Sequence, residues 1–165
     1  MGTHLFVRSS AILELEPMEA FEFYLWVFEK NRSQPNWSNF QVINKLGNKL
    51  NFRAEYRLLG KPTIFEGVAI LNPERVVEFS ITNISQPMFK ADPALIRYVL
   101  RPVRQGTLVT KTWHFMFQSK LHPLYEWLVA LQIKRNLSQS FKADIRNLEQ
   151  WGVDATEKRA LPISA

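Results

Sequence analysis

The segment LHPLYEWLVALQIKRNLSQSFKADIRNLEQWG, residues 121–152, decides the fold, because it is the one long helical pattern in the chain. Pro123 fits the first turn of a helix and Gly152 fits the glycine that ends one, so we expect a helix from Leu121 to Trp151. At ~1.5 Å per residue this helix is about 45 Å long, enough to run the diagonal of a domain. A long helix after a series of strands predicts a sheet that grips the helix around a cavity.

The apolar side chains of this helix form two stripes about a quarter turn apart, at roughly 100° per residue. The first comprises Leu124, Leu128 and Leu131. The second comprises Leu137, Phe141, Ile145 and Leu148. Because one straight helix cannot press both stripes against a flat surface, we expect a bend or a change of packing partners near residues 135–136. On this view Trp127 and Leu131 belong to the lid of the cavity and the second stripe belongs to the core.

The residues before this helix alternate between apolar and polar side chains over short runs separated by turn signals such as Gly47-Asn48, the pattern of an antiparallel meander. The predicted strands are His4–Leu13, Phe40–Leu46, Lys49–Leu59, Thr63–Leu71, Val76–Ile84, Leu95–Val103 and Thr107–Phe117. A short helix is predicted over Pro17–Phe28, and residues 31–39 are expected to form a loop or single turn that Trp37 anchors.

These elements predict an α+β helix-grip fold. A curved antiparallel sheet of about seven strands should wrap around the long C-terminal helix, with one or two short helices after the first strand. The length of 165 residues and the lack of a linker indicate a single domain over residues 1–153, with 154–165 as a flexible tail.

Composition narrows the functional classes. The chain has no cysteine, which excludes disulfides and thiolate metal sites, and we expect a cytoplasmic protein with no signal peptide and no membrane-spanning segment. Its net charge of +6 comes from dispersed cations, among them Arg97, Arg101 and Lys111, which we expect on solvated faces. Without a recognisable motif, nucleic-acid binding is not expected.

One hairpin resembles a known superfamily. The stretch YVLRPVRQGTLVT, residues 98–110, is similar to the penultimate hairpin of the SRPBCC superfamily, which includes START-like, polyketide cyclase and birch-pollen-allergen-like proteins. Residues 12–20, ILELEPMEA, with Trp37 downstream, resemble that superfamily's first strand, first helix and tryptophan-bearing loop. The resemblance covers roughly Leu5 to Gly152. Since Gly47-Asn48 is a bare turn, the glycine-rich loop of the plant allergens is missing, and their ligands are not carried over.

The resemblance implies a deep apolar cavity between sheet and helix that holds a lipid, polyketide, sterol or similar molecule. Many members bind or transport such molecules, and a few are cyclases, aromatases or dehydratases. We expect a binding or transport protein, with an acid/base enzyme of the cyclase or dehydratase type as the first alternative. An interaction module with a filled core is the second alternative, and the residues leave open a homodimer.

Three residues are candidates for acid/base chemistry. Glu66 shares a strand face with Ile64 and Val68, and a carboxylate on a cavity wall would have a raised pKa. If the other face of that strand points inward, Glu66 faces water instead. The same choice applies to His114, which could move protons near neutral pH if it faces the cavity. Tyr98 should point inward, where its hydroxyl needs a partner.

The residues expected to bind the ligand are Trp37, Tyr56, Glu66, Phe79, Tyr98, His114, Trp127 and Leu131. We expect the entrance to this cavity between the long helix and the loops around Trp37 and residues 88–89. Three scattered histidines have no metal-ligand spacing, and no phosphate-binding or cofactor motif is present, so no metal and no cofactor are expected.

Overall fold

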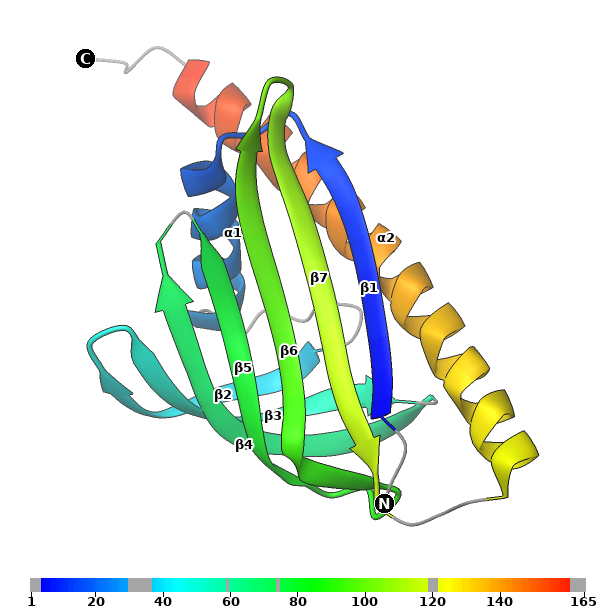
Figure 1. Cartoon of the computed structure of the whole chain (residues 1–165). Coiled ribbons are helices and arrows are strands. Elements are labelled where there is room, and N and C mark those ends of the chain that lie inside the picture. Colours follow the sequence, from blue (N-terminus) through cyan, green and yellow to red (C-terminus); the bar gives the residue numbers. More distant parts are fainter. Residues whose placement is uncertain (1–3, 30–36, 59, 74, 119–121, 161–165) are drawn as a thin grey trace.

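The computed structural model describes residues 4–29, 37–58, 60–73, 75–118 and 122–160 (Figure 1). Its elements are β1 (His4–Leu13), α1 (Pro17–Glu29), β2 (Trp37–Leu46), β3 (Lys49–Leu58), β4 (Lys61–Asn72), β5 (Val76–Ile84), β6 (Phe89–Val103), β7 (Gly106–Phe117) and α2 (Pro123–Ala160). All strands pair antiparallel in one sheet of order β1-β7-β6-β5-β4-β3-β2. The predicted helix-grip fold is confirmed.

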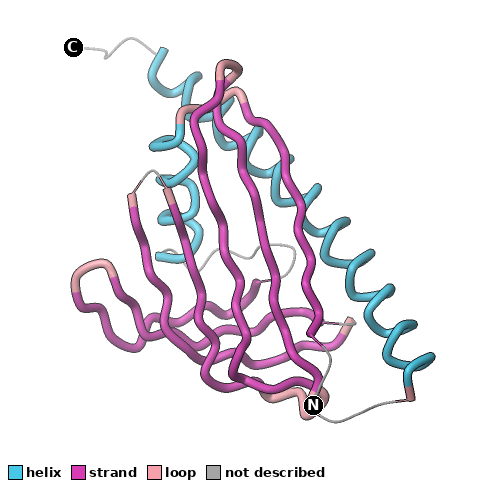
Figure 2. The backbone as a smooth tube through the Cα atoms, viewed as in Figure 1, coloured by secondary structure: helices cyan, strands magenta, loops and turns pink. Residues whose placement is uncertain are grey.

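The sheet is curved, and both helices lie on the same side of it, as Figures 1 and 2 show. We call this side the helix-covered face and the opposite side the outer face. Strand alternation puts aromatic side chains on the helix-covered face, for example Phe52 and Tyr56 on β3 and Phe79 on β5. The tight turn between β2 and β3 uses Gly47 at a positive φ of 61°, as its sequence predicted.

Helix α2 presents one continuous apolar stripe to the sheet. Its buried members are Val129, Ile133, Leu137, Phe141, Ile145 and Leu148. Most of them follow one another at spacings of four residues, so the stripe winds slowly around α2 as the helix crosses the sheet. The prediction that the first half of the helix packs through Leu124, Leu128 and Leu131 is therefore wrong, because Val129 and Ile133 take that role and the three leucines are exposed. The bend expected near residues 135–136 stays a prediction.

The end of α2 also differs from the prediction. Gly152 lies inside the helix, which continues to Ala160. A Cβ atom at Gly152 would come within 2.6 Å of Leu15 Cδ2, so the glycine permits close packing against the segment that follows β1. The start of α2 is capped by His122, whose Nδ1 accepts a hydrogen bond from the Leu124 N–H at 3.3 Å.

Two further boundaries depart from the sequence analysis. Trp37 begins β2 instead of lying in a loop, because it pairs with Tyr56 across the β2–β3 ladder. The rest of the expected loop up to residue 36 lies outside the described residues. Strand β6 begins at Phe89, earlier than predicted, with an irregular register between Lys90 and Leu95. Within the described ranges, no helix is both long enough and apolar enough to cross a membrane.

Candidate functional site

A salt bridge is buried between the sheet and α2. Lys111 on β7 is 0 % exposed and Asp144 on α2 is 2 % exposed, and the Lys111 Nζ lies 3.1 Å from the Asp144 Oδ2. Lys111 occupies an inward position between Val109 and Trp113, so strand alternation forces its side chain beneath the helix. Asp144 lies one turn after Phe141 on the buried stripe of α2. The two charges therefore neutralise each other inside an apolar core.

Aromatic rings surround this ion pair. The Lys111 Nζ lies 4.7 Å from the Tyr98 ring centroid and 4.8 Å from that of Trp113, both within cation–π range. The Trp113 indole N–H donates to the Tyr56 hydroxyl at 2.8 Å, and the Trp37 indole N–H donates to the Tyr98 hydroxyl at 3.4 Å. The polar atoms of these rings thus bond to one another.

Burial and neighbouring charges shift the pKa values of the side chains in this cluster. Burial alone would lower the pKa of the Lys111 ammonium, but the adjoining Asp144 carboxylate outweighs this and raises the pKa well above its usual value. Tyr24 on α1 joins the cluster, since its ring centroid lies 4.7 Å from that of Tyr98. Burial likewise raises the pKa of the Tyr98 and Tyr24 hydroxyls. At neutral pH the cluster therefore holds an ammonium and two neutral phenols. Lys111 can stabilise negative charge there.

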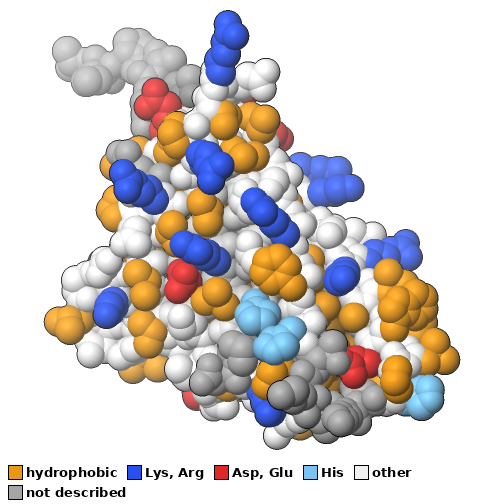
Figure 3. All heavy atoms as spheres, in the orientation of Figure 1, with side chains coloured by type: hydrophobic (Ala, Val, Ile, Leu, Met, Phe, Trp, Pro, Cys, Tyr) orange, Lys and Arg blue, Asp and Glu red, His pale blue; other side chains and the backbone are white. Residues whose placement is uncertain are grey.

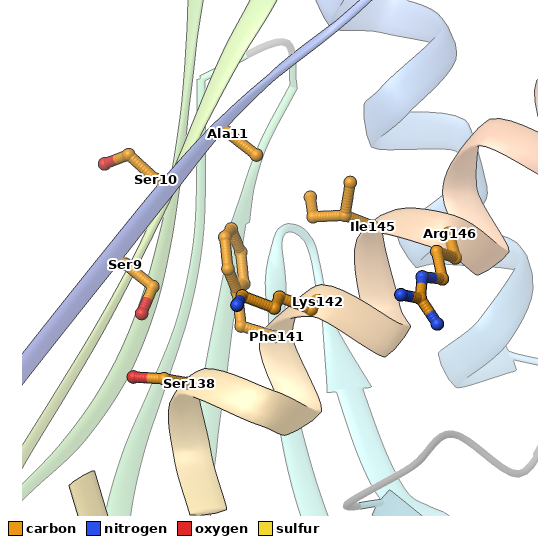
Figure 4. Close-up of a pocket in the computed structure, with 8 residues that line it drawn as sticks. All are labelled: Ser9, Ser10, Ala11, Ser138, Phe141, Lys142, Ile145 and Arg146. Carbon is orange, nitrogen blue, oxygen red and sulfur yellow. The ribbon is translucent and has the colours of Figure 1, made fainter. Parts of the chain in front are cut away.

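A groove of about 510 Å³ lies between β1 and α2 (Figure 4). Its lining consists of Ser9, Ser10, Ala11, Ser138, Phe141, Lys142, Ile145 and Arg146. Ser9 is the register partner of Lys111, and Phe141 and Ile145 flank Asp144 on α2. Volumes of roughly 300 to 1,000 Å³ are typical of small-molecule sites.

The groove exists because β1 carries small side chains where α2 approaches it. The inward positions of β1 run from Leu5 and Val7 through Ser9 and Ala11 to Leu13, so bulk is missing in the middle of the strand. Figure 4 shows Ser9 and Ala11 pointing toward α2. The groove combines an apolar floor, serine hydroxyls and two cations, which suits an apolar molecule with an anionic group.

Four of the residues expected to bind a ligand lie together on the helix-covered face. They are Trp37, Tyr56, Phe79 and Tyr98, and all are buried. The Trp37 ring centroid is 4.6 Å from that of Tyr56 and 4.9 Å from that of Phe79. The prediction that Tyr98 points inward is confirmed. The role of the four residues in ligand binding stays a prediction.

Glu66 lies on the outer face, across the sheet from the ion pair. Its carboxylate contacts Arg53 at 3.6 Å and accepts a hydrogen bond from the Asn83 side chain at 3.0 Å. Phe65 and Gly67 occupy the neighbouring inward positions of β4, which turns the Glu66 side chain outward. The structure thus realises the second of the two orientations that the sequence left open for this residue.

His114 also lies on the outer face, because Trp113 and Phe115 take the inward positions of β7. Its ring stacks on that of His4 with centroids 5.1 Å apart, and the two rings share a hydrogen bond of 2.9 Å between His114 Nε2 and His4 Nδ1. Of the three candidates for acid/base chemistry, Tyr98 alone therefore lies on the helix-covered face.

Trp127 and Leu131 are not in a lid over the aromatic cluster. Their side chains are 59 % and 51 % exposed, on the side of α2 that faces away from its buried stripe. The cause is the phase of α2, because Val129 and Ile133 fill the positions against the sheet. Another surface hollow, of about 300 Å³, is lined by residues 61–63 and 85–88 and lies near the predicted entrance.

Sequence reasoning missed Lys111 and Asp144. The prediction that Lys111 lies on a solvated face is wrong, because the residue is fully buried. A signal was present, since Lys111 is the charged member of an inward series that otherwise contains Val109, Trp113 and Phe115. Asp144 likewise stands between Phe141 and Leu148 on an apolar stripe. A cation and an anion that interrupt two facing apolar stripes indicate a buried pair. Within the described part of the chain, no three metal-ligating side chains converge.

No protein-family model matches the chain, and no curated protein matches its sequence. Solved structures do match its fold. The Zhui aromatase/cyclase from a Streptomyces species is 9 % identical, with a TM-score of 0.66 over 99 % of each chain. A START superfamily protein from Mycobacterium smegmatis is 10 % identical, with a TM-score of 0.59 over 88 % of this chain and 99 % of that one.

The di-domain ARO/CYC StfQ from the steffimycin biosynthetic pathway is 9 % identical, with a TM-score of 0.76 over 93 % of this chain. The match covers 52 % of StfQ, so this chain spans about half its length. At such identities the similarity establishes the fold. The chain has the helix-grip fold that these solved structures share, as the sequence of its β6–β7 hairpin and first helix predicted.

Proposed function

We propose that this protein binds a hydrophobic small molecule, such as a lipid, polyketide or sterol derivative, and that the molecule carries an anionic group. The observation that supports this most directly is the groove between β1 and α2. Phe141, Ile145 and Ala11 offer an apolar floor, and Lys142 and Arg146 place two cations at its edge. A cytoplasmic location remains part of the proposal.

Anionic aromatic and aliphatic probes test this function. The fluorescent anion 1-anilinonaphthalene-8-sulfonate and sodium oleate should bind with affinities in the micromolar range, whereas the neutral probe 1-aminoanthracene should bind more weakly. Ala11→Phe fills the groove and should weaken both anions by at least about tenfold, or ~1.4 kcal/mol. Ile12→Phe is the matched control, because Ile12 adjoins Ala11 in β1 but is exposed on the outer face.

A separate variant tests whether binding requires the anionic group of the probe. Lys142→Glu combined with Arg146→Glu should weaken the anions and leave 1-aminoanthracene unchanged, since both residues are exposed and reversal of their charge alters the edge of the groove only. Equal binding to the wild type and to Ala11→Phe would place the ligand elsewhere. Failure of every probe to bind would remove the proposal.

An acid/base enzyme is a second candidate, supported by the buried cluster. The Asp144 Oδ1 atom has no hydrogen-bond partner among the described residues, although it is buried. That oxygen could remove the α-proton of a β-hydroxyketone, and Lys111 would stabilise the resulting enolate. The protonated Asp144 would then return the proton to the β-hydroxyl, which leaves as water. A β-hydroxyketone thioester surrogate tests this candidate, because dehydration lowers its mass by one water. Turnover in the wild type that Asp144→Asn abolishes would support the enzyme, and no turnover by the wild type would oppose it.

A further inference from the structure

We propose that the first half of α2 docks the protein on an anionic lipid surface. The exposed apolar side chains of this region are Leu124, Tyr125, Trp127, Leu128 and Leu131. Leu124, Leu128 and Leu131 follow one another at four and three residues, and Trp127 lies beside them, so these four share one side of the helix. We call Leu124, Trp127, Leu128 and Leu131 the α2 apolar face. This inference does not depend on a ligand in the groove.

Cations continue the α2 apolar face along the same side of the helix. Arg135 follows Leu131 by four residues, and Lys142 and Arg146 follow at seven and four. All three are exposed, as is Lys134. In Figure 3 a hydrophobic patch lies at the lower right, over the start of α2, and cationic side chains lie further along the helix. Tryptophan and leucine next to lysine and arginine are typical of helices that lie in the lipid interface.

Charge complementarity indicates which partner the α2 apolar face contacts. Between residues 123 and 148 the chain has two acidic residues, Glu126 and Asp144, against four cations. Asp144 is neutralised by Lys111 inside the core, and Glu126 is partly buried. The exposed surface of this stretch is therefore strongly cationic. An anionic bilayer attracts such a surface, and each cation near it strengthens binding about fivefold.

A second copy of the chain fits this surface poorly, because it carries the same cationic surface and offers these four cations no complementary negative charge. A protein groove that encloses a helix also fits poorly. The opposite side of this region is occupied, since Val129 and Ile133 are buried against the sheet. A flat surface can contact one exposed side of a helix that is fixed on its other side. This geometry favours the bilayer over both alternatives.

The position of the α2 apolar face connects it to the groove. Ser138, Lys142 and Arg146 line the groove and continue the series that begins with Leu124. A molecule that leaves the bilayer along this side of α2 would meet an apolar surface first and the groove next. The docking surface would thus place the groove beside the membrane.

Vesicle flotation tests the inference on the full chain. The wild type should float with vesicles of phosphatidylcholine and one-third phosphatidylglycerol, should bind pure phosphatidylcholine at least about tenfold more weakly, and should dissociate as salt increases. Trp127→Ser combined with Leu131→Ser should weaken binding by at least about tenfold, because both side chains would lie in the interface. Ile43→Ser combined with Leu46→Ser is the matched control, since these residues are 67 % and 79 % exposed on the β2–β3 hairpin.

Several outcomes would overturn the inference. These are no binding to the mixed vesicles, equal loss in the control variant, or binding that does not depend on phosphatidylglycerol. A dimer in light scattering that Trp127→Ser with Leu131→Ser dissociates would assign the α2 apolar face to a second copy. A blue shift of tryptophan fluorescence on vesicles, absent in Trp127→Phe, would support insertion of Trp127.

Discussion

Replacement of Asp144 by asparagine tests the buried ion pair. The asparagine keeps the volume of the side chain but removes the charge that lies 3.1 Å from the Lys111 Nζ. Because Lys111 is completely buried, its ammonium would then be an uncompensated charge in an apolar core. Removal of one partner of a buried pair costs about 3–5 kcal/mol. We expect urea unfolding of Asp144→Asn at pH 7 to show a loss in this range.

The free energy of unfolding of Asp144→Asn should also depend on pH, which a simple packing defect would not cause. In the wild type the pKa of Lys111 is raised by folding, so its stabilisation is present below about pH 10.5 and is lost only as pH rises through the higher folded pKa. In Asp144→Asn the carboxylate no longer opposes burial, which is the largest influence on Lys111, so that pKa should fall. The unfolded chain then binds the proton more tightly, and stability should rise with pH by up to ~1.4 kcal/mol per unit.

A double variant provides the control. Lys111→Met with Asp144→Leu removes both charges and fills the space with apolar atoms, so its stability should match or exceed that of the wild type. Its stability should also be independent of pH between pH 7 and 10 as far as this pair is concerned. A loss below about 1 kcal/mol in Asp144→Asn, with no slope against pH, would refute the argument, since it would mean that water reaches Lys111.

Three further predictions concern the scaffold. Leu148→Ala should lower the free energy of unfolding in urea by about 2–5 kcal/mol, because Leu148 is buried in the core. Leu131→Ala should change it by less than about 0.5 kcal/mol, because Leu131 is exposed. Equal losses in the two variants would contradict the assignment of the buried side of α2. Gly106→Ala should cost about 2 kcal/mol or more, since φ is 131° and the new Cβ would meet the Leu13 carbonyl oxygen, and an unchanged melting temperature would contradict this. Burial raises the pKa of Tyr98, so Tyr98→Phe should leave the phenolate absorbance of the folded protein unchanged at about pH 10, and a decrease there would show that Tyr98 is solvated.

The fold could be predicted from the sequence because its signals are local. Alternation identified the inward residues of β3 and β5, and the turn at Gly47 fixed the register of a hairpin. The phase of α2 could not be predicted in the same way. Its first half is apolar on two sides, through Val129 and Ile133 on one and Leu124 and Leu128 on the other. Periodicity alone does not say which side meets the sheet.

The candidate site was harder to predict, because it depends on which face of each strand the helix covers. For Glu66 and His114 both orientations were consistent with the pattern, and the outward one is realised because bulkier neighbours such as Trp113 turn inward. Lys111 could have been identified as buried, since it interrupts an apolar face. Its partner could not, because Asp144 is 33 residues away and only the path of α2 across the sheet brings them together.

The first half of α2 has apolar side chains on two sides, one buried and one exposed. Its buried stripe packs against the core, whereas Leu124 and Trp127 on the other side are exposed. Exposed tryptophan and leucine cost solubility unless another surface covers them, at least for part of the time. The cations that follow them select an anionic surface, and the same cations line the groove. On the two proposals above, one stretch of helix joins a lipid surface, in which an amphipathic molecule dissolves, to a groove whose lining matches the apolar and anionic parts of that molecule.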